Sequence, residues 1–151
     1  MKIIISLCVL FLMLSCSNQS NDNRKDGYTE VLKSHQDSLL QEVLNGHDYG
    51  MARMGKISKY QTRIQASLDS LNKLPAKKMS TFYKQQLTDL KEKLESATMG
   101  MNHWMEEFKM DSFSNLPDER LHYLENEKIK IGDVKNAIRE SLFLGDSLLH
   151  R

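Results

Sequence analysis

The chain has 151 residues, of which 40% are hydrophobic, and its 21 Lys and Arg nearly balance its 20 Asp and Glu. A chain of this length suits one domain with a modest core. Because the balanced charge leaves no excess of positive charge and no block of Lys or Arg, the composition argues against nucleic-acid binding.

Residues 1–16 have the pattern of a bacterial export signal. Lys2 precedes a mostly apolar run from Ile3 to Leu14, and the small residue Ser15 stands before Cys16. A positive start, a short apolar segment and a small residue are the parts of a secretory signal peptide. With Cys placed next, the pattern resembles a lipobox, which implies cleavage after Ser15 and acylation of Cys16. A retained anchor and a plain secretory signal are the alternatives, but a membrane span needs a longer run of roughly 20 residues.

Cys16 also bears on the chemistry and the location of the mature chain. Cys8 leaves with residues 1–15, so no thiol remains for a disulfide or a thiolate metal site once Cys16 carries lipid. Residues 17–26 are polar throughout and predict a flexible tether, so residues 16–26 form the lipidated cysteine and its tether. Ser17 and the scarcity of nearby acidic residues resemble the outer-membrane lipoproteins, which implies the periplasmic face of the outer membrane.

Residues 28–74 carry the first helical pattern, in which apolar side chains recur every three or four residues. The stripe consists of Tyr28, Val31, Leu32, His35, Leu39, Val43, His47, Met51, Met54, Ile57, Tyr60, Ile64, Leu68 and Leu71. Asn45–Asp48 is its weak place, since Asn-Gly can end a helix and Asp can begin one. One long or kinked helix is favoured over two helices split near Gly46, because the stripe keeps its phase.

Two further stripes follow. The second runs from Met79 to Phe108, and the third begins at Pro117, which a first helical turn tolerates, and passes through Lys128 to Leu149. The charge series Glu125, Glu127, Lys128 and Lys130, which shares Lys128 with the stripe, is expected to form a solvated face. Because no segment alternates with the period of a strand, the sequence predicts an all-α domain over residues 27–151. It is expected to be an antiparallel bundle or coiled coil of three long helices joined by short turns.

Short turns also predict which residues face each other. A turn centred near residue 76 places position x of the first helix opposite about 152 − x of the second. Because the second helix then ends near the level of residue 42, residues 28–41 are expected to overhang. We expect this segment to bind a protein partner or a second copy of the chain. A coiled stalk toward the membrane and a short fourth helix that folds back are the alternatives.

The same register brings methionines and histidines to one level. The group comprises His47, Met51 and Met54 of the first helix and Met101, His103 and Met105 of the second, beside Trp104. Thioether and imidazole ligands suit Cu(I), which makes the first six a candidate soft-metal site. Methionine also fills irregular cores and packs against aromatic rings, and core packing is the favoured interpretation. The sequence therefore predicts no cofactor, with Cu(I) as the alternative.

Three stretches carry a family resemblance. They are His47-Asp48-x-x-Met51-x-x-Met54-Gly-Lys-Ile57, Met101-Asn-His-Trp104-Met105-Glu-Glu-Phe108, and a last helix ending in Ser147-Leu-Leu149. With the lipobox, this layout resembles the small helical lipoproteins common in Bacteroidetes that are described as like a viral A-type inclusion protein. The resemblance covers roughly residues 39–149 and implies the helical fold and the lipid anchor, while the family carries no known activity.

The motif content favours a role without catalysis. The sequence has neither the Ser/His/Asp arrangement of a hydrolase nor a glycine-rich phosphate loop, so no enzyme is expected. It favours a lipid-anchored envelope lipoprotein whose helical bundle is a structural or interaction module. The alternative is a periplasmic Cu(I)-binding protein that uses the Met/His cluster.

Overall fold

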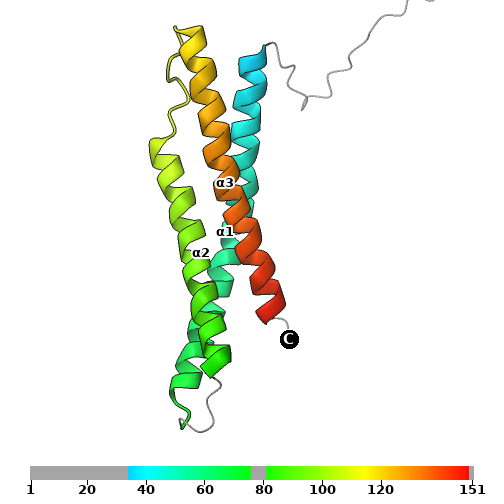
Figure 1. Ribbon diagram of the computed structural model, residues 1–151, viewed down its shortest axis with the longest axis vertical. Coiled ribbons are helices and arrows are strands. Elements are labelled where there is room, and N and C mark those ends of the chain that lie inside the picture. The colour runs from blue at the N-terminus through cyan, green and yellow to red at the C-terminus, as the bar shows by residue number, and fades with distance from the viewer. Residues whose placement is uncertain (1–33, 76–80, 150–151) are drawn as a thin grey trace, which may run out of the picture. The chain divides into compact units, whose positions relative to one another are not determined.

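The structure is a computed structural model that describes residues 34–75 and 81–149. Its helices are α1 (His35–Asn72), α2 (Thr81–Glu107) and α3 (Pro117–Leu149), and none of the described residues forms a strand. The helices lie side by side and contact one another (Figure 1), which confirms the predicted all-α bundle of three long helices. The predictions for the signal peptide, for Cys16, for the tether and for residues 28–33 lie outside the described residues.

α1 is one continuous helix of 38 residues, which corresponds to about 57 Å at 1.5 Å per residue. It begins after Ser34, whose side chain accepts a hydrogen bond from the Asp37 N–H at 3.1 Å. This bond satisfies one of the N–H groups that a first helical turn leaves without a partner. The helix runs through Asn45–Asp48 without interruption, so the split near Gly46 that the sequence allowed does not occur.

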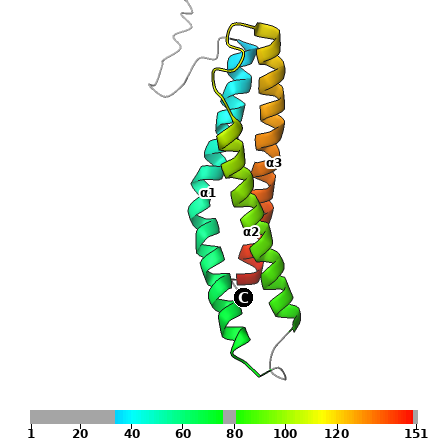
Figure 2. The same ribbon diagram turned by 90° about the vertical axis from the view of Figure 1, so that its left-hand side faces the viewer.

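α1 and α3 run parallel, and α2 runs antiparallel to both. Gln36 Nε2 donates to the Pro117 carbonyl at 2.7 Å where both helices begin, and Arg63 Nη2 donates to the Leu149 carbonyl at 2.6 Å farther along. Figures 1 and 2 show the N-terminal ends of α1 and α3 at the same end of the bundle, where α2 finishes. Two reversals of the chain produce this up-down-up order.

The expected overhang is absent from the part of that segment that the structure describes, residues 34–41. Leu39 is buried, and Gln36 is hydrogen-bonded to Pro117. The overhang was expected because α2 ends before it reaches this part of α1. However, α3 starts after a loop at 108–116 and reaches farther along α1 than α2 does, so α3 covers these residues. At the opposite end, α1 and α2 continue past the last described turn of α3 (Figure 2).

The core consists of one apolar stripe from each helix, at the three- and four-residue steps that the sequence predicts. The buried side chains are Leu39, Val43, Ile57, Tyr60, Ile64 and Leu68 of α1, Leu87, Leu90, Leu94, Ala97, Met101 and Trp104 of α2, and Leu124, Ile131, Ile138, Leu142 and Leu149 of α3. Burial of one Leu or Ile side chain contributes about 1.5–3 kcal/mol to folding. These stripes, more than helix propensity, hold the bundle together.

Two buried glycines of α1 let the other helices approach closely. A Cβ added to Gly46 would lie 2.9 Å from Cγ1 of Ile131, and one on Gly50 would lie 3.1 Å from Cδ1 of Ile138. Gly50 also faces the end of the Met101 side chain from α2. A glycine inside a helix costs about 0.5–1 kcal/mol relative to alanine. Here the neighbouring helices fill the vacant space with apolar side chains, which offsets that cost.

Gly145 and Gly55 make a matched pair of tests for this packing. A Cβ on Gly145 would lie 2.6 Å from Cε2 of the buried Tyr60 ring, whereas one on Gly55 meets nothing within 4 Å. We expect Gly145→Ala to lower the free energy of unfolding by about 1–3 kcal/mol, because the ring has to shift. We expect Gly55→Ala to raise it by about 0.5–1 kcal/mol through helix propensity. Urea unfolding followed by circular dichroism measures both, and changes of the same sign would contradict the close approach.

Candidate functional site

The predicted register between α1 and α2 is confirmed at the level of the Met/His cluster. The ring centroids of His47 and Trp104 are 5.8 Å apart, and Gly50 lies against Met101. Both pairs agree with the predicted register to within one residue. The His47 ring also lies beside its neighbour in the chain, with Nδ1 at 3.0 Å from Oδ1 of Asp48.

The six candidate metal ligands do not turn toward one another. Met101 is fully buried, whereas the side chain of His103 is 70% exposed. Residues two positions apart lie on different faces of a helix, so these two side chains point in different directions. Met51 and Met105 are exposed as well, and Met54 is partly buried against the core.

In this part of α1, Gly50 faces α2 and Met51 is exposed. Because the sequence pattern placed Met51 in the facing position, the candidate ligands differ in burial more than expected. In the described ranges, no three His, Cys, Asp or Glu side chains form a group that could hold a metal ion. Copper binding by all six residues would require Met101 to leave the core, and it stays a prediction.

Aromatic rings occupy this level of the bundle instead. Trp104 stacks on Phe108 with ring centroids 4.8 Å apart, and Phe108 stacks on Tyr123 at 6.1 Å. His47 adjoins the first ring of the series, and Phe113 lies 5.9 Å from the last. We call these five residues the aromatic column. Since offset aromatic pairs add about 0.5–1.5 kcal/mol beyond the area that they bury, the column stabilises this end of the bundle.

The loop between α2 and α3 is fastened to the aromatic column. The Lys109 N–H donates to Tyr123 Oη at 2.8 Å, and Arg120 Nη1 donates to the Met110 carbonyl at 3.0 Å. Phe113 has a φ of 57°, a left-handed conformation that costs about 1–3 kcal/mol for a bulky residue. The hydrogen bonds and the contact of its ring with Tyr123 hold the chain in this conformation.

Glu127 is a buried charge beside the aromatic column. Its side chain is 3% exposed, Oε2 accepts a hydrogen bond from Trp104 Nε1 at 2.9 Å, and Oε1 lies 2.8 Å from Lys130 Nζ. The hydrogen bond to this carboxylate raises the pKa of Lys130 above its ordinary value. Burying a carboxylate without partners would cost several kcal/mol, so these two contacts are what allows Glu127 to lie inside. Glu127 thereby links α3 to the aromatic column.

The sequence pattern placed Lys128 both in the apolar stripe and, with Glu127, in a solvated charge series. The stripe assignment of Lys128 and the solvated assignment of Glu127 are wrong, and the solvated assignment of Lys128 is confirmed. Lys128 is exposed and forms an ion pair with Glu42 of α1. Glu127 lies three residues after the buried Leu124 and four before the buried Ile131, so the stripe passes through it. That spacing could have identified Glu127 as a buried residue. Because Glu is charged, the residue was assigned to the surface instead.

Glu127 and Glu125 allow a test of this link. Glu127→Ala removes the acceptor of the buried Trp104 N–H, and we expect a loss of about 1–3 kcal/mol in the free energy of unfolding. Glu125 is 48% exposed and pairs with His122 on the surface, so Glu125→Ala is the control and is expected to change stability by less than about 0.5 kcal/mol. Urea unfolding followed by tryptophan fluorescence compares them. Equal losses would show that Glu127 does not anchor the aromatic column.

A second polar cluster joins α1 to the end of α3. Tyr60 Oη donates to the Asp146 carboxylate, and Lys56 Nζ lies 2.9 Å from Oδ2 of the same group. Burial, and then the hydrogen bond to Asp146, raises the pKa of Tyr60, and the hydrogen bond to Asp146 raises the pKa of Lys56. At neutral pH, Tyr60 is therefore a hydrogen-bond donor and Lys56 is charged, so both hold the carboxylate in place.

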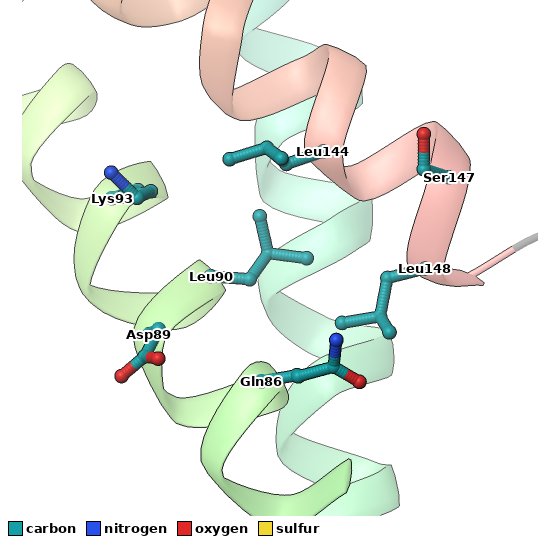
Figure 3. A pocket seen from close by; sticks show the side chains of 7 residues that line it. All are labelled: Gln86, Asp89, Leu90, Lys93, Leu144, Ser147 and Leu148. Carbon is teal, nitrogen blue, oxygen red and sulfur yellow. The ribbon is translucent and has the colours of Figure 1, made fainter. Parts of the chain in front are cut away.

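A groove lies between α2 and α3, close to the end of α3. Leu90, Leu144 and Leu148 point into a space of about 350 Å³, and Asp89 and Lys93 stand at its edge (Figure 3). Gln86 of α2 and Ser147 of α3 complete the lining, which therefore combines an apolar centre with polar residues. The arrangement offers a contact surface for an apolar group and does not place paired acids or bases opposite each other.

The comparisons with known proteins contribute no assignment. No family model, no curated protein and no solved structure matches the chain. Across 34–75 and 81–149, no helix combines the length and the apolar character that crossing a membrane requires.

Proposed function

We propose that the chain is a lipoprotein of the bacterial outer membrane, held on the periplasmic face by lipid on Cys16. Its helical bundle is then a structural or interaction module without catalysis. The observation that carries the proposal is the run from Lys2 to Cys16, in which a cationic start, an apolar segment and Ser15 precede the cysteine. The family resemblance of the later segments supports the same assignment.

The polar groups inside the bundle support a role without catalysis. Glu127 is bonded to Trp104 and Lys130, and the buried Ser141 hydroxyl donates to the Ile138 carbonyl at 3.0 Å. A general acid or base has to reach a substrate from a cleft, whereas these groups are bonded to neighbours within the fold. They therefore contribute to the packing of the helices.

We also propose that the chain associates with itself through residues 28–41. The fold limits which residues of this segment can make the contact. Leu39 already packs within the bundle, so its apolar surface is not available to a second copy. Tyr28, Val31 and Leu32 are the apolar residues of the segment that precede α1. We propose that these three side chains make the contact between copies of the chain.

Replacement of the two cysteines tests the anchor. Cells that express the chain would be fed an alkyne analogue of palmitate, and the labelled protein would be located by membrane fractionation. We expect Cys16→Ala to lose the label and to leave the outer-membrane fraction. Cys8→Ala, inside the predicted signal peptide, is the control and is expected to keep both. Label that persists in Cys16→Ala would refute the anchor.

Substitution before α1 tests the contact between copies. Tyr28, Val31 and Leu32 would be replaced together by serine in the full chain, with Asn21→Ser and Asn23→Ser combined as the control. We expect the unaltered chain and the control to have the mass of a dimer or larger assembly in detergent solution, and the triple variant that of a monomer. Light scattering with a detergent correction gives the mass. Equal masses for the triple variant and the unaltered chain would exclude this contact.

A further inference from the structure

Positive charge collects along the seam between the parallel helices α1 and α3. We call the following cations and their acidic neighbours the basic seam: Arg53, Lys56, Arg63, Lys128, Lys135 and Arg139, with Glu42 and Asp146. The chain as a whole is close to neutral, so this excess of cations is a local feature. A concentration of one sign of charge along a groove attracts ligands of the opposite sign.

Half of the cations in the basic seam already have partners. Lys128 pairs with Glu42, Lys56 pairs with Asp146, and Arg63 donates to the Leu149 carbonyl. These contacts use both acidic residues of the seam. The remaining cations, Arg53, Lys135 and Arg139, have no carboxylate partner among the described residues and no hydrogen bond that joins them to an acceptor on another helix.

Two of these cations are positioned by one tyrosine. The Arg53 guanidinium lies 3.4 Å from the centroid of the Tyr49 ring, and its Nη1 donates to the Tyr49 carbonyl at 2.8 Å. Lys135 Nζ, from α3, lies 5.1 Å from the same centroid. Stacking on an aromatic ring orients a guanidinium while leaving its remaining N–H groups available to an anion.

The basic seam opens into a hollow of about 560 Å³ that combines charge with apolar surface. Arg53 and Arg139 border it from α1 and α3, Lys56 and Asp146 line it as a pair, and Phe143 and the largely buried Leu142 complete the lining. The Phe143 side chain is 70% exposed, an unusual position for a phenylalanine in water. Glu140 does not line this hollow, although it borders a neighbouring depression together with Arg139 and Phe143. The hollow therefore has a cationic part and an apolar part.

We propose that this hollow binds an anionic phospholipid, with its phosphate on Arg53 and Arg139 and its apolar portion on Phe143. Guanidinium groups match phosphate because two parallel N–H groups can donate to two oxygens. Lys135 adds charge from beside Tyr49. An acidic peptide would satisfy the cations but would leave Phe143 in water, which favours the lipid. The site is independent of lipid on Cys16, so it stands or falls separately from the proposed anchor.

Calorimetric titration of the full chain in a neutral maltoside detergent tests the site. The probes are dihexanoyl phosphatidylglycerol, the zwitterionic dihexanoyl phosphatidylcholine, inorganic phosphate and a triglutamate peptide. We expect the phosphatidylglycerol to bind most tightly, and to bind about tenfold or more weakly after Arg53→Gln combined with Arg139→Gln. Lys91→Gln combined with Lys93→Gln, on α2 away from the basic seam, is the control and is expected to bind as the unaltered chain does.

Further arms of the same titration distinguish the ligand classes. Arg139→Gln alone, at an exposed side chain, gives a second variant should the double variant unfold, and Phe143→Ser is expected to weaken lipid binding without affecting phosphate. Equal affinity for the two lipids would refute the role of charge. Binding of phosphate or triglutamate as tight as that of phosphatidylglycerol would refute the lipid, and unchanged binding in both arginine variants would refute the site.

Discussion

The close approach of the helices at Gly46 and Gly50 is the constraint on which the rest of the bundle depends. Ile131 of α3 and Met101 of α2 fill the space that side chains on α1 would take. The two glycines lie one turn apart on α1 and receive Ile131 and Ile138 of α3 and Met101 of α2, so these contacts fix the level at which the three helices meet. Trp104 then meets the carboxylate that it bonds, and the cations of α1 and α3 line up along one seam.

The fold could be predicted from spacing, because a helix that buries one face must repeat its apolar residues every three or four positions. The pairing level of α1 and α2 was predictable as well, because a short turn fixes the offset between antiparallel helices. The side of α1 that faces α2 was not. Hydropathy gives weight to Met51 and none to Gly50, although the glycine holds the core position. The proximity expected for the six candidate copper ligands depended on that choice, and copper binding stays a prediction.

Glu127 shows a second limit of sequence patterns. Steps of three and of four both fit a helical stripe, so position 127 or 128 could lie inside, and both carry charged residues. What decides between them is a hydrogen-bond donor on another helix, the indole of Trp104, whose position follows only from the packed arrangement. The basic seam could not be predicted from the sequence either, because its cations come from two helices that are distant in the chain and meet only after packing.

α3 ends beside Arg63, so the bundle has three helices on one side of this level and only α1 and α2 on the other. We expect the two parts to differ in the free energy of local unfolding. The Arg63 guanidinium supplies positive charge to a helix terminus whose own last turn has no basic residue, which holds the three-helix part closed. Beyond it, α1 and α2 have each other as neighbours, with Leu68 as a buried contact there. Segments with fewer apolar contacts exchange their amide hydrogens through local openings of lower free energy. We therefore expect the described parts of α1 and α2 beyond Arg63 to open before the three-helix part, in a motion that leaves the aromatic column and its loop intact.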